Sequence, residues 1–319
     1  MGKLIDGHWS NDWYKPDEKG HFVREETKFR GAVSADGSTG FRAEPGRYHL
    51  YVSLACPWAH RTLVARALKQ LESAIDISVV HPHMGDDGWE FGDFPGAIAD
   101  SLHGARYLHE VYTRAKPDYT GRVTVPVLWD KQTDRIVCNE SRLILRMLSR
   151  EFDEFAGSRR DLCPLAQTPA IDAEIDALYA PVNNGVYRAG FAVKQGAYET
   201  AVRELFAALD GYEARLEKQR FLLGAQLTEA DICFFTTLLR FDPVYHYHFK
   251  CNLRRLSDYP ALFGYLRDLY QTPGVAETCN LEHIKHHYFT SHPNVNPTRI
   301  VPVGPLLDLT ASHGRERLG

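Results

Sequence analysis

The pattern of apolar residues changes near residue 153, and this change limits the possible folds more than any other feature of the sequence. Before that point the predicted elements follow the order strand, helix, strand, long loop, strand, strand and helix. After it, every predicted element is a helix. A βαβ unit followed by a hairpin and a helix is typical of an α/β layered domain. The sequence therefore predicts an α/β domain and then an all-helical domain, and 319 residues are enough for two hydrophobic cores.

The elements of the α/β part are predicted from short apolar runs and from helical spacings. A helix is expected after Cys56-Pro57, because apolar residues from Val64 to Leu71 recur at spacings of three and four. Residues 83–121 are rich in Gly, Asp and aromatic residues and are predicted to be a long loop, which in a compact domain is usually functional or disordered. The expected strands are 47–53, 75–80, 124–130 and 135–138, and a second helix is expected over 141–150.

The helical part follows a linker near residues 153–169. Thr228 and Asp231 have the spacing of a capping box ahead of an apolar run. The expected helices are 170–193, 197–219, 229–241, 258–270 and 274–287. Residues 1–46 are polar, charged and aromatic without clear periodicity, and we expect them to wrap over the fold or to be partly mobile. The predicted boundaries are an N-terminal extension over 1–46, an α/β domain over 47–152, a helical domain over 166–290 and a C-terminal tail over 291–319.

Composition and charge narrow the class of function. A formal net charge of −4 offers no basic surface for nucleic acid or for an anionic membrane. The N-terminus is too polar for a signal peptide, and the apolar runs are too short to span a bilayer. Six cysteines are scattered without a close pair, which is typical of free thiols in a reducing compartment. We therefore expect a cytoplasmic protein that binds neither nucleic acid nor membrane.

Several histidines raise the alternative of a metal site. They occur as His-x-His or as adjacent residues, with no cysteine at ligand spacing. The residues considered are His81, His83, His246, His248, His283, His286 and His287. This pattern is weak evidence for a metal, and we expect none.

Cys56 stands between a predicted strand and the start of a predicted helix. The unpaired N–H groups and the dipole of a helix start favour the thiolate, which is the reactive form of cysteine. His60 and Arg61 in the first turn add positive potential, whereas the alternative is an inert buried thiol. Ala59 occupies the place of the second cysteine of a Cys-x-x-Cys site, so the resolving thiol must come from solution. Glutathione is the abundant cytosolic thiol, and the pattern predicts a glutathione-dependent nucleophile at Cys56.

Six motifs together closely resemble those of the Xi-class glutathione transferases, also called glutathionyl-hydroquinone reductases. They are Ser53–Arg61, Arg122–Asp130, Asn139–Ser141, Asn183–Tyr187, Phe241–Tyr245 and His292–Pro297. The resemblance spans most of the chain, whereas the Cys-Pro pair alone also fits the Omega class or glutaredoxins. It implies a thioredoxin-like N-terminal domain followed by an all-helical C-terminal domain, the glutathione transferase fold.

The resemblance also implies a glutathione site. A cis Pro126 would aim the backbone N–H and C=O of Val125 at the cysteinyl backbone of glutathione; a strand-edge proline is the alternative. Glu140 and Ser141 start a helix, whose N-terminus suits the α-carboxylate of the γ-glutamyl group; plain helix capping is the alternative. Arg122 matches a position that contacts the glycyl end of glutathione; an exposed arginine is the alternative.

An aromatic acceptor site follows from the same resemblance. Trp89 is implied to pack beside both glutathione and the substrate ring, and Tyr187, Tyr245 and Tyr288 to line the hydroquinone pocket. Phenol hydroxyls can hydrogen-bond the quinol oxygens and protonate the departing ring, and Tyr187 and Tyr288 are expected to act in catalysis. The alternative is that all four are ordinary core aromatics. Members of the class are typically dimers joined through their helical domains, so we expect a homodimer.

The predicted reaction is the glutathione-dependent reduction of glutathionyl-hydroquinones through a Cys56–glutathione mixed disulfide, which releases oxidised glutathione. Glutathione is thus the expected co-substrate. A related alternative is a thiol transferase or dehydroascorbate reductase that deglutathionylates other substrates. Conjugation of glutathione to an electrophile is weaker, because it usually needs a Ser or Tyr hydroxyl, for which only Ser53 is close by. A non-catalytic binding protein on the same fold is the third alternative.

Overall fold

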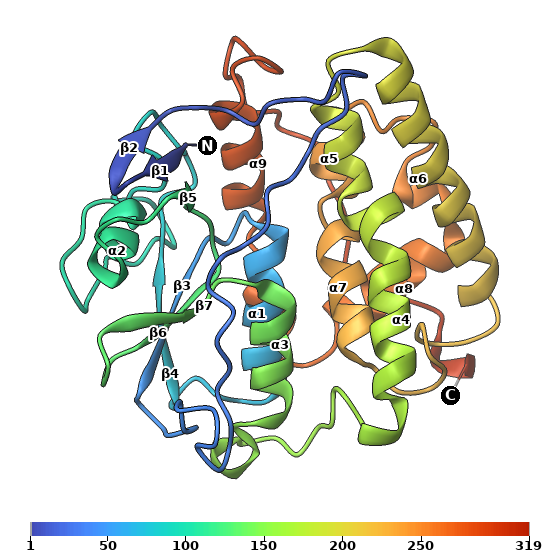
Figure 1. Cartoon of the computed structure of the whole chain (residues 1–319). Coiled ribbons are helices and arrows are strands. Elements are labelled where there is room, and N and C mark those ends of the chain that lie inside the picture. The colour runs from blue at the N-terminus through green and yellow to red at the C-terminus, as the bar shows by residue number, and fades with distance from the viewer. Residues whose placement is uncertain (1, 319) are drawn as a thin grey trace. The chain divides into compact units, whose positions relative to one another are not determined.

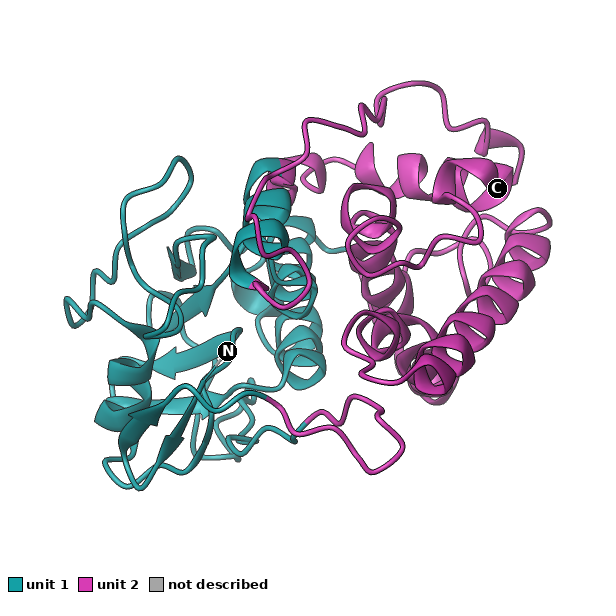
Figure 2. Cartoon of the chain, turned by 90° about the horizontal axis from the view of Figure 1, so that it is seen from above, with its two compact units in different colours: residues 1–13, 25–160, 282–291 teal, residues 14–24, 161–281, 292–319 magenta. Residues whose placement is uncertain are grey.

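The computed structural model describes residues 2–318 and divides into two compact units, which are coloured separately in Figure 2. Neither unit is continuous in sequence. Unit 1 comprises residues 1–13, 25–160 and 282–291, and unit 2 comprises 14–24, 161–281 and 292–319. These units differ from the contiguous predicted boundaries in two segments, because residues 14–24 group with the helical unit and residues 282–291 with the α/β unit.

A four-stranded sheet forms the centre of unit 1. The strands are β3 (Tyr48–Val52), β4 (Ile75–Val79), β6 (Val127–Asp130) and β7 (Arg135–Cys138), in the spatial order β4-β3-β6-β7. β3 and β4 are parallel, and the other two pairs are antiparallel. All five residues of β3 are buried, as expected for a strand covered on both faces. The predicted order of these strands along the chain and the thioredoxin-like fold are confirmed.

Three helices accompany this sheet. α1 (Pro57–Leu68) and α3 (Ser141–Arg150) pack against each other on one side, and α2 (Leu108–Ala115) lies on the other (Figure 1). The prediction of a loop over 83–121 is therefore wrong for the stretch that forms α2. The buried residues of α2 are Leu108, Val111 and Tyr112, which recur at helical spacing inside a segment whose Gly and Asp content obscured the signal.

The N-terminal segment also contains regular structure that the sequence analysis missed. β1 (Lys3–Ile5) and β2 (His8–Ser10) form a hairpin, and β1 pairs in addition with β5 (Gly121–Arg122). The connecting residues Asp6 and Gly7 both have positive φ, 47° and 79°. An Asp-Gly pair in this conformation is typical of a two-residue hairpin turn. The sequence analysis predicted an extension over residues 1–46 and identified no strand in it, so this hairpin is a finding of the structure.

Unit 2 is a bundle of helices. They are α4 (Thr168–Leu178), α5 (Gly185–Gly190), α6 (Gln195–Leu216), α7 (Glu229–Leu238) and α8 (Pro260–Tyr270). Short 3₁₀ turns of unit 2 occur at Leu165–Gln167, Leu256–Asp258, Ala276–Thr278 and Glu316–Leu318, and one at Asp153–Phe155 belongs to unit 1. Within residues 2–318 no helix is both long enough and apolar enough to cross a bilayer.

Two prolines interrupt the helices of unit 2. Pro181 lies in a π-helical turn, Tyr179–Asn183, that separates α4 from α5, and Pro243 lies in a second one, Phe241–Tyr245, beyond α7. A proline inside a helix lacks the N–H of the i to i−4 bond and clashes with the preceding turn, so the chain widens locally. The prediction of one continuous helix over 170–193 is therefore wrong.

The last helix, α9 (Leu281–Ser291), starts seven residues later than the predicted helix over 274–287. The Nδ1 atom of His287 lies 2.9 Å from the Pro82 carbonyl oxygen, and the Ser291 hydroxyl accepts from the Met84 N–H at 2.9 Å. These hydrogen bonds fasten α9 to the loop after β4, and they explain why its residues group with unit 1.

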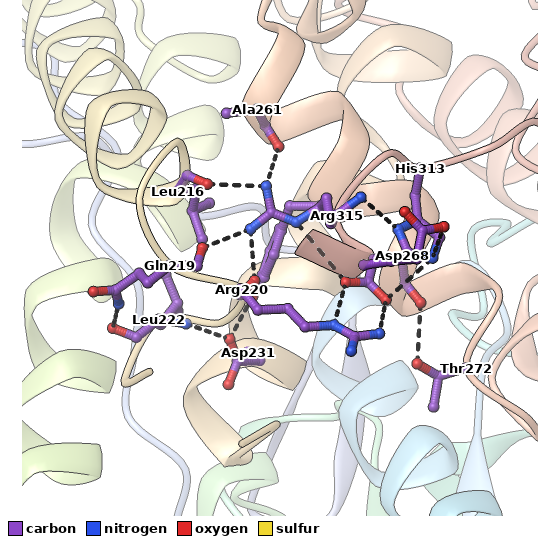
Figure 3. Close-up of polar contacts among 12 residues, drawn as sticks. Leu216, Gln219, Arg220, Leu222, Asp231, Ala261, Asp268, Thr272, His313 and Arg315 are labelled. Atoms are coloured by element: carbon purple, nitrogen blue, oxygen red, sulfur yellow. Dashed lines mark hydrogen bonds and ion pairs between the residues drawn. The ribbon is translucent and has the colours of Figure 1, made fainter. Parts of the chain in front are cut away.

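The C-terminal tail is anchored in unit 2 by Arg315, which is buried (Figure 3). Its guanidinium donates hydrogen bonds to four backbone carbonyls, those of Leu216, Gln219, Arg220 and Ala261. Leu216 is the last residue of α6, and carbonyls at a helix end have no partner within the helix. Asp268 receives a two-pronged ion pair from Arg220 at 2.9 and 3.0 Å and lies 3.8 Å from the Arg315 Nε. The tail therefore supplies hydrogen-bond donors to the carbonyl groups at the C-terminal end of α6.

Candidate active site

Cys56 is the N-cap residue of α1, with an extended backbone at φ −77° and ψ 121°. Its side chain makes no capping hydrogen bond, and Pro57 begins the helix. Its Sγ atom lies 3.7 Å from the carbonyl oxygen of Val125. The thiol thus sits beside the N–H groups of the first helical turn, where a thiolate is favoured over a thiol.

Two basic residues lie in the first turn of α1, as predicted, and both are buried. The His60 N–H donates to the Cys56 carbonyl at 2.9 Å, which is the first hydrogen bond of the helix. The Arg61 guanidinium lies 4.4 Å from the Trp58 ring centroid. A cation held by an aromatic face close to the helix start adds positive potential in a region of low dielectric.

The other cysteines differ from Cys56 in their surroundings. Burial raises the pKa of both Cys138 and Cys279 to about 12, and it also raises the pKa of Cys251. Cys163 and Cys233 are buried, whereas Cys56 and Cys279 are partly exposed. Cys56 therefore combines access to solvent with a position at a helix start.

Val125 and Pro126 lie opposite Cys56, directly before β6. The peptide bond between them is cis, as the resemblance implied. The short approach of the Cys56 thiol to the Val125 carbonyl brings this pair and the nucleophile together in unit 1.

Glu140 and Ser141 start α3, as predicted. Glu140 is the N-cap residue, and one carboxylate oxygen accepts from the Arg142 N–H at 3.3 Å. The other oxygen accepts from the Thr27 hydroxyl at 3.0 Å, a contact that the sequence did not indicate. Ser141 is buried in the first turn. The start of a ten-residue helix with these two side chains is suited to a ligand that carries both a carboxylate and an ammonium group.

Arg122 in β5 is only 6% exposed, so the alternative of an exposed arginine is wrong. Its Nε and Nη2 atoms lie 2.9 and 2.8 Å from one carboxylate oxygen of Glu25, and Nη1 donates to the Asp12 carbonyl. The guanidinium is thus held by two residues of the N-terminal segment. Neither partner was predicted, because nothing local in the sequence connects them to Arg122.

Trp89 is buried in the long segment between β4 and α2. Its ring stacks on that of His287 with centroids 4.8 Å apart, and the His287 ring lies 5.2 Å from that of Tyr288. Among residues 2–318, no hydrogen-bond partner is found for the buried Trp89 Nε1. The structure therefore places the predicted Trp89 and Tyr288 on either side of His287, which the sequence analysis considered only as a metal ligand. In the described part of the chain no three His, Cys, Asp or Glu side chains gather to hold a metal ion.

Tyr187 and Tyr245 come together within unit 2. Their ring centroids are 6.0 Å apart, and each lies 5.6 Å from the ring of Phe249. Tyr187 follows the first π-helical turn by four residues, and Tyr245 ends the second. Arg24 of the N-terminal segment lies over the Tyr187 ring at 4.9 Å. Such π-helical turns are frequent at functional sites.

Comparisons with known proteins identify the family of this chain. Family models for the N-terminal and C-terminal domains of glutathione S-transferases match residues 55–151 and 195–268. The chain is 52% identical to glutathionyl-hydroquinone reductase YqjG of Escherichia coli (strain K12), with 99% of each protein covered. It is also 52% identical to glutathionyl-hydroquinone reductase PcpF of Sphingobium chlorophenolicum, with 96% of each covered.

Solved structures extend the likeness to three dimensions. A Xi class glutathione transferase from Natrialba magadii is 53% identical and superposes with a TM-score of 0.95, covering 100% of this chain and 97% of that one. The glutathione-bound structure of YqjG is 50% identical, with a TM-score of 0.91 and 99% of each chain covered. This chain therefore belongs to the glutathione transferase superfamily and, within it, to the Xi class of glutathionyl-hydroquinone reductases.

Proposed function

We propose that this protein reduces glutathionyl-hydroquinones to hydroquinones with glutathione as co-substrate, and that Cys56 is the nucleophile. The observation that carries the proposal is the position of Cys56, a partly exposed thiol at the start of α1 and 3.7 Å from the Val125 carbonyl. The full-length likeness to two proteins named glutathionyl-hydroquinone reductases supports the choice of substrate class.

In the first step the Cys56 thiolate attacks the sulfur of the glutathionyl-hydroquinone. A sulfur–sulfur bond forms, the bond between sulfur and ring carbon breaks, and the electron pair goes to the ring carbon, which takes up a proton. The products are a free hydroquinone and a Cys56–glutathione mixed disulfide. Ala59 stands where a Cys-x-x-Cys motif has its second cysteine, so no neighbouring thiol in Cys56–Ala59 can resolve the mixed disulfide.

A second glutathione completes the cycle. Its thiolate attacks the glutathione sulfur of the mixed disulfide, which forms oxidised glutathione and returns Cys56 as a thiolate. The glutathionyl group of the substrate and one free glutathione are thus joined as one disulfide for each hydroquinone released. A release of the first product before the second glutathione binds predicts ping-pong kinetics.

The remaining predicted residues receive roles within this scheme. Glu140, Ser141, Arg122 and the backbone of Val125, next to Pro126, are proposed to bind glutathione. Trp89, Tyr187, Tyr245 and Tyr288 are proposed to contact the hydroquinone ring. The Tyr187 and Tyr288 hydroxyls are the proposed proton donors, because a phenol can both hydrogen-bond a quinol oxygen and give up a proton.

The test mixes the protein with the glutathione conjugate of menadiol and excess glutathione, and quantifies free hydroquinone and oxidised glutathione. We expect equal amounts of both products. Cys56→Ala should lower turnover by at least about a thousandfold, because it removes the covalent intermediate. Cys279→Ala is the matched control: it removes another partly exposed cysteine, and turnover should stay within about twofold.

Two outcomes would contradict the proposal. Unchanged turnover in Cys56→Ala would remove Cys56 from the reaction. No turnover in the unmodified protein, with a glutathione adduct still found on Cys56 by mass spectrometry, would favour a thiol transferase with a different substrate.

We also propose that the protein is a cytoplasmic homodimer joined through its helical unit. Reduced glutathione, which the second step consumes, is abundant in the cytosol. Large apolar side chains on unit 2 support a self-association surface, with Tyr247 73% and Leu253 63% exposed. Sedimentation at micromolar concentration tests this, and a monomer mass would contradict it.

A further inference from the structure

The N-terminal segment Glu25–Gly31, called here the N-terminal strap, lies along the edge of unit 1 where α3 begins. The Phe29 N–H donates to the Asn139 side chain at 3.1 Å, and the Asn139 N–H donates to the Phe29 carbonyl at 3.0 Å. Arg30 pairs with Cys138 as an isolated antiparallel bridge, and the Gly31 N–H donates to the Val137 carbonyl at 2.9 Å. These bonds continue the sheet by one short strand beside β7 and fix the register of the strap.

The fixed register determines which strap residues face the site. The Glu25 carboxylate, whose side chain is 46% exposed, accepts from Arg122, and the Thr27 hydroxyl donates to Glu140. At Phe29 the contact with Asn139 is made by the backbone N–H. Alternate residues of an extended chain point to the same side. Glu26, between the two polar residues of this set, is exposed.

Thr27 completes the hydrogen bonding of the Glu140 carboxylate. One oxygen of Glu140 is held by the Arg142 N–H and the other by the Thr27 hydroxyl, at 3.3 and 3.0 Å. A carboxylate held through both oxygens has a defined orientation. Because its side chain is already ordered, binding a ligand costs less conformational entropy. Thr27 is half-buried, so its hydrogen bond is shielded from water on one side.

Glu25 acts in the same way on Arg122. The guanidinium is buried, and its three nitrogens are contacted by Glu25 and by the Asp12 carbonyl. A buried cation is stable only when it is paired. The hydrogen-bond partners of a guanidinium also set the orientation of its plane. The charged residues at both proposed ends of the glutathione site, Glu140 and Arg122, are therefore oriented from the strap.

We propose that Thr27 and Glu25 are positioning residues for glutathione, acting through Glu140 and Arg122. This inference rests on the proposed function, since it takes these two residues as glutathione ligands. It adds that the strap is part of the glutathione site. The strap should affect the affinity for glutathione and leave the chemistry at Cys56 nearly unchanged.

The key variant is Thr27→Val, which removes the hydroxyl and keeps the shape of the side chain. We expect the KM for glutathione to rise about three- to tenfold with kcat changed less than about twofold, as for the loss of one hydrogen bond to a charged group. Thr27→Ser restores the hydroxyl and should return KM to within about twofold. Glu25→Ala should raise KM by a similar factor, and Glu25→Gln, which keeps an acceptor, should raise it less.

Glu26→Gln is the matched control, because Glu26 is a carboxylate between Glu25 and Thr27 and is exposed, as Glu25 is. Its KM should stay within about twofold of the unmodified protein. A fall in kcat with no change of KM in Thr27→Val, or equal effects of Val and Ser at this position, would overturn the positioning role of Thr27. A KM for glutathione that falls in Glu25→Ala would show that Glu25 competes with the ligand and does not position Arg122 for it.

Direct binding separates a failure of this inference from a failure of the proposed function. Glutathione is titrated calorimetrically into Cys56→Ser protein, with Thr27 either intact or replaced by Val. Binding that weakens about three- to tenfold with Thr27→Val supports the inference. Equal binding by both proteins overturns the inference alone, whereas no binding by either overturns the proposed glutathione site as well.

Discussion

Two helices, one in each unit, begin in opposite ways. α7 in unit 2 begins with a capping box, in which the Asp231 carboxylate accepts from the Thr228 N–H and hydroxyl at 2.8 and 3.0 Å. α1 in unit 1 begins with Cys56, whose side chain makes no capping hydrogen bond. A cap stabilises a helix by satisfying its first N–H groups. A start without a cap leaves the field of those groups directed at the thiol, where it favours the thiolate.

The same contrast holds for other buried polar groups. In unit 2 Asp231 also accepts from the Leu222 N–H and the Tyr265 hydroxyl, both at 2.8 Å, and Arg315 satisfies carbonyls at the end of α6 (Figure 3). In unit 1 Glu25 and Thr27 are bonded to residues proposed to bind glutathione. Buried polar groups in unit 2 therefore hold helix ends in place, whereas the more exposed Glu25 and Thr27 of unit 1 are proposed to orient a site.

The largest expected effect on stability comes from removing the Asp231 carboxylate from the capping box of α7. Asp231→Ala leaves four buried donors without their acceptor, and we expect the free energy of unfolding to fall by about 3 to 5 kcal/mol. Urea unfolding followed by circular dichroism measures it. Glu199→Ala, which removes an exposed carboxylate with a hydrogen bond from Gln195, should change it by less than about 0.5 kcal/mol. A loss below about 1 kcal/mol for Asp231→Ala would show that the hydrogen bonds to Asp231 do not stabilise the fold.

Low pH should destabilise both units, because each contains a buried histidine. The two units are therefore expected to be similar in their stability toward acid. Burial lowers the pKa of His49 in unit 1 and of His248 in unit 2, each to about 4 from an ordinary value of 6.5. Below pH 6.5 the unfolded chain takes up protons that the folded protein does not. Stability is therefore full above pH 6.5 and falls as the pH drops toward 4, by about 3 kcal/mol for each histidine.

Urea unfolding of His49→Gln and His248→Gln at pH 7 and pH 4.5 measures this dependence. Each variant should lose less stability between the two pH values than the unmodified protein. The exposed His8 provides the control, as His8→Gln should keep the full dependence. An unchanged pH dependence in both buried variants would assign the acid sensitivity to other groups.

The smallest expected effect compares the two N-cap residues directly. Thr228→Ala should lower the free energy of unfolding by about 1 kcal/mol, the usual value for a lost cap. Cys56→Ala should change it by less than about 0.5 kcal/mol, since no capping bond is lost. Urea unfolding of both variants at pH 7 measures the pair. A loss above about 1 kcal/mol in Cys56→Ala would mean that the thiol caps α1, and the contrast between the two helix starts would fail.

Local patterns were enough to predict much of the fold. The strands around β3, the start of α1 at Pro57 and the capping box at Thr228 all follow from residues within a few positions of one another. α2 was missed because its apolar face spans only eight residues inside a Gly- and Asp-rich segment. The helix predicted over 170–193 failed at Pro181, where a helix-breaking residue was passed over.

The residues of the candidate site also differ in whether local sequence patterns predicted them. Cys56, Glu140 and Ser141 were predicted because a helix start is a local signal, and Arg122, Trp89 and the tyrosines came only from the family resemblance. Their roles stay predictions until the variants are measured. Thr27 and Glu25 were missed altogether, because they lie 113 and 97 residues from Glu140 and Arg122 in the chain.

The sequence by itself determined that this chain has an α/β domain and a helical domain, and it predicted that Cys56 at a helix start is the reactive thiol. These properties depend on periodicity and on helix starts, which neighbouring residues establish. Only the tertiary structure decided that α9 joins unit 1, that Tyr187 meets Tyr245, and that the strap holds Arg122 and Glu140. Such contacts join segments about a hundred residues apart or more in most cases, and their specificity comes from burial and hydrogen bonding that exist only after the chain has folded.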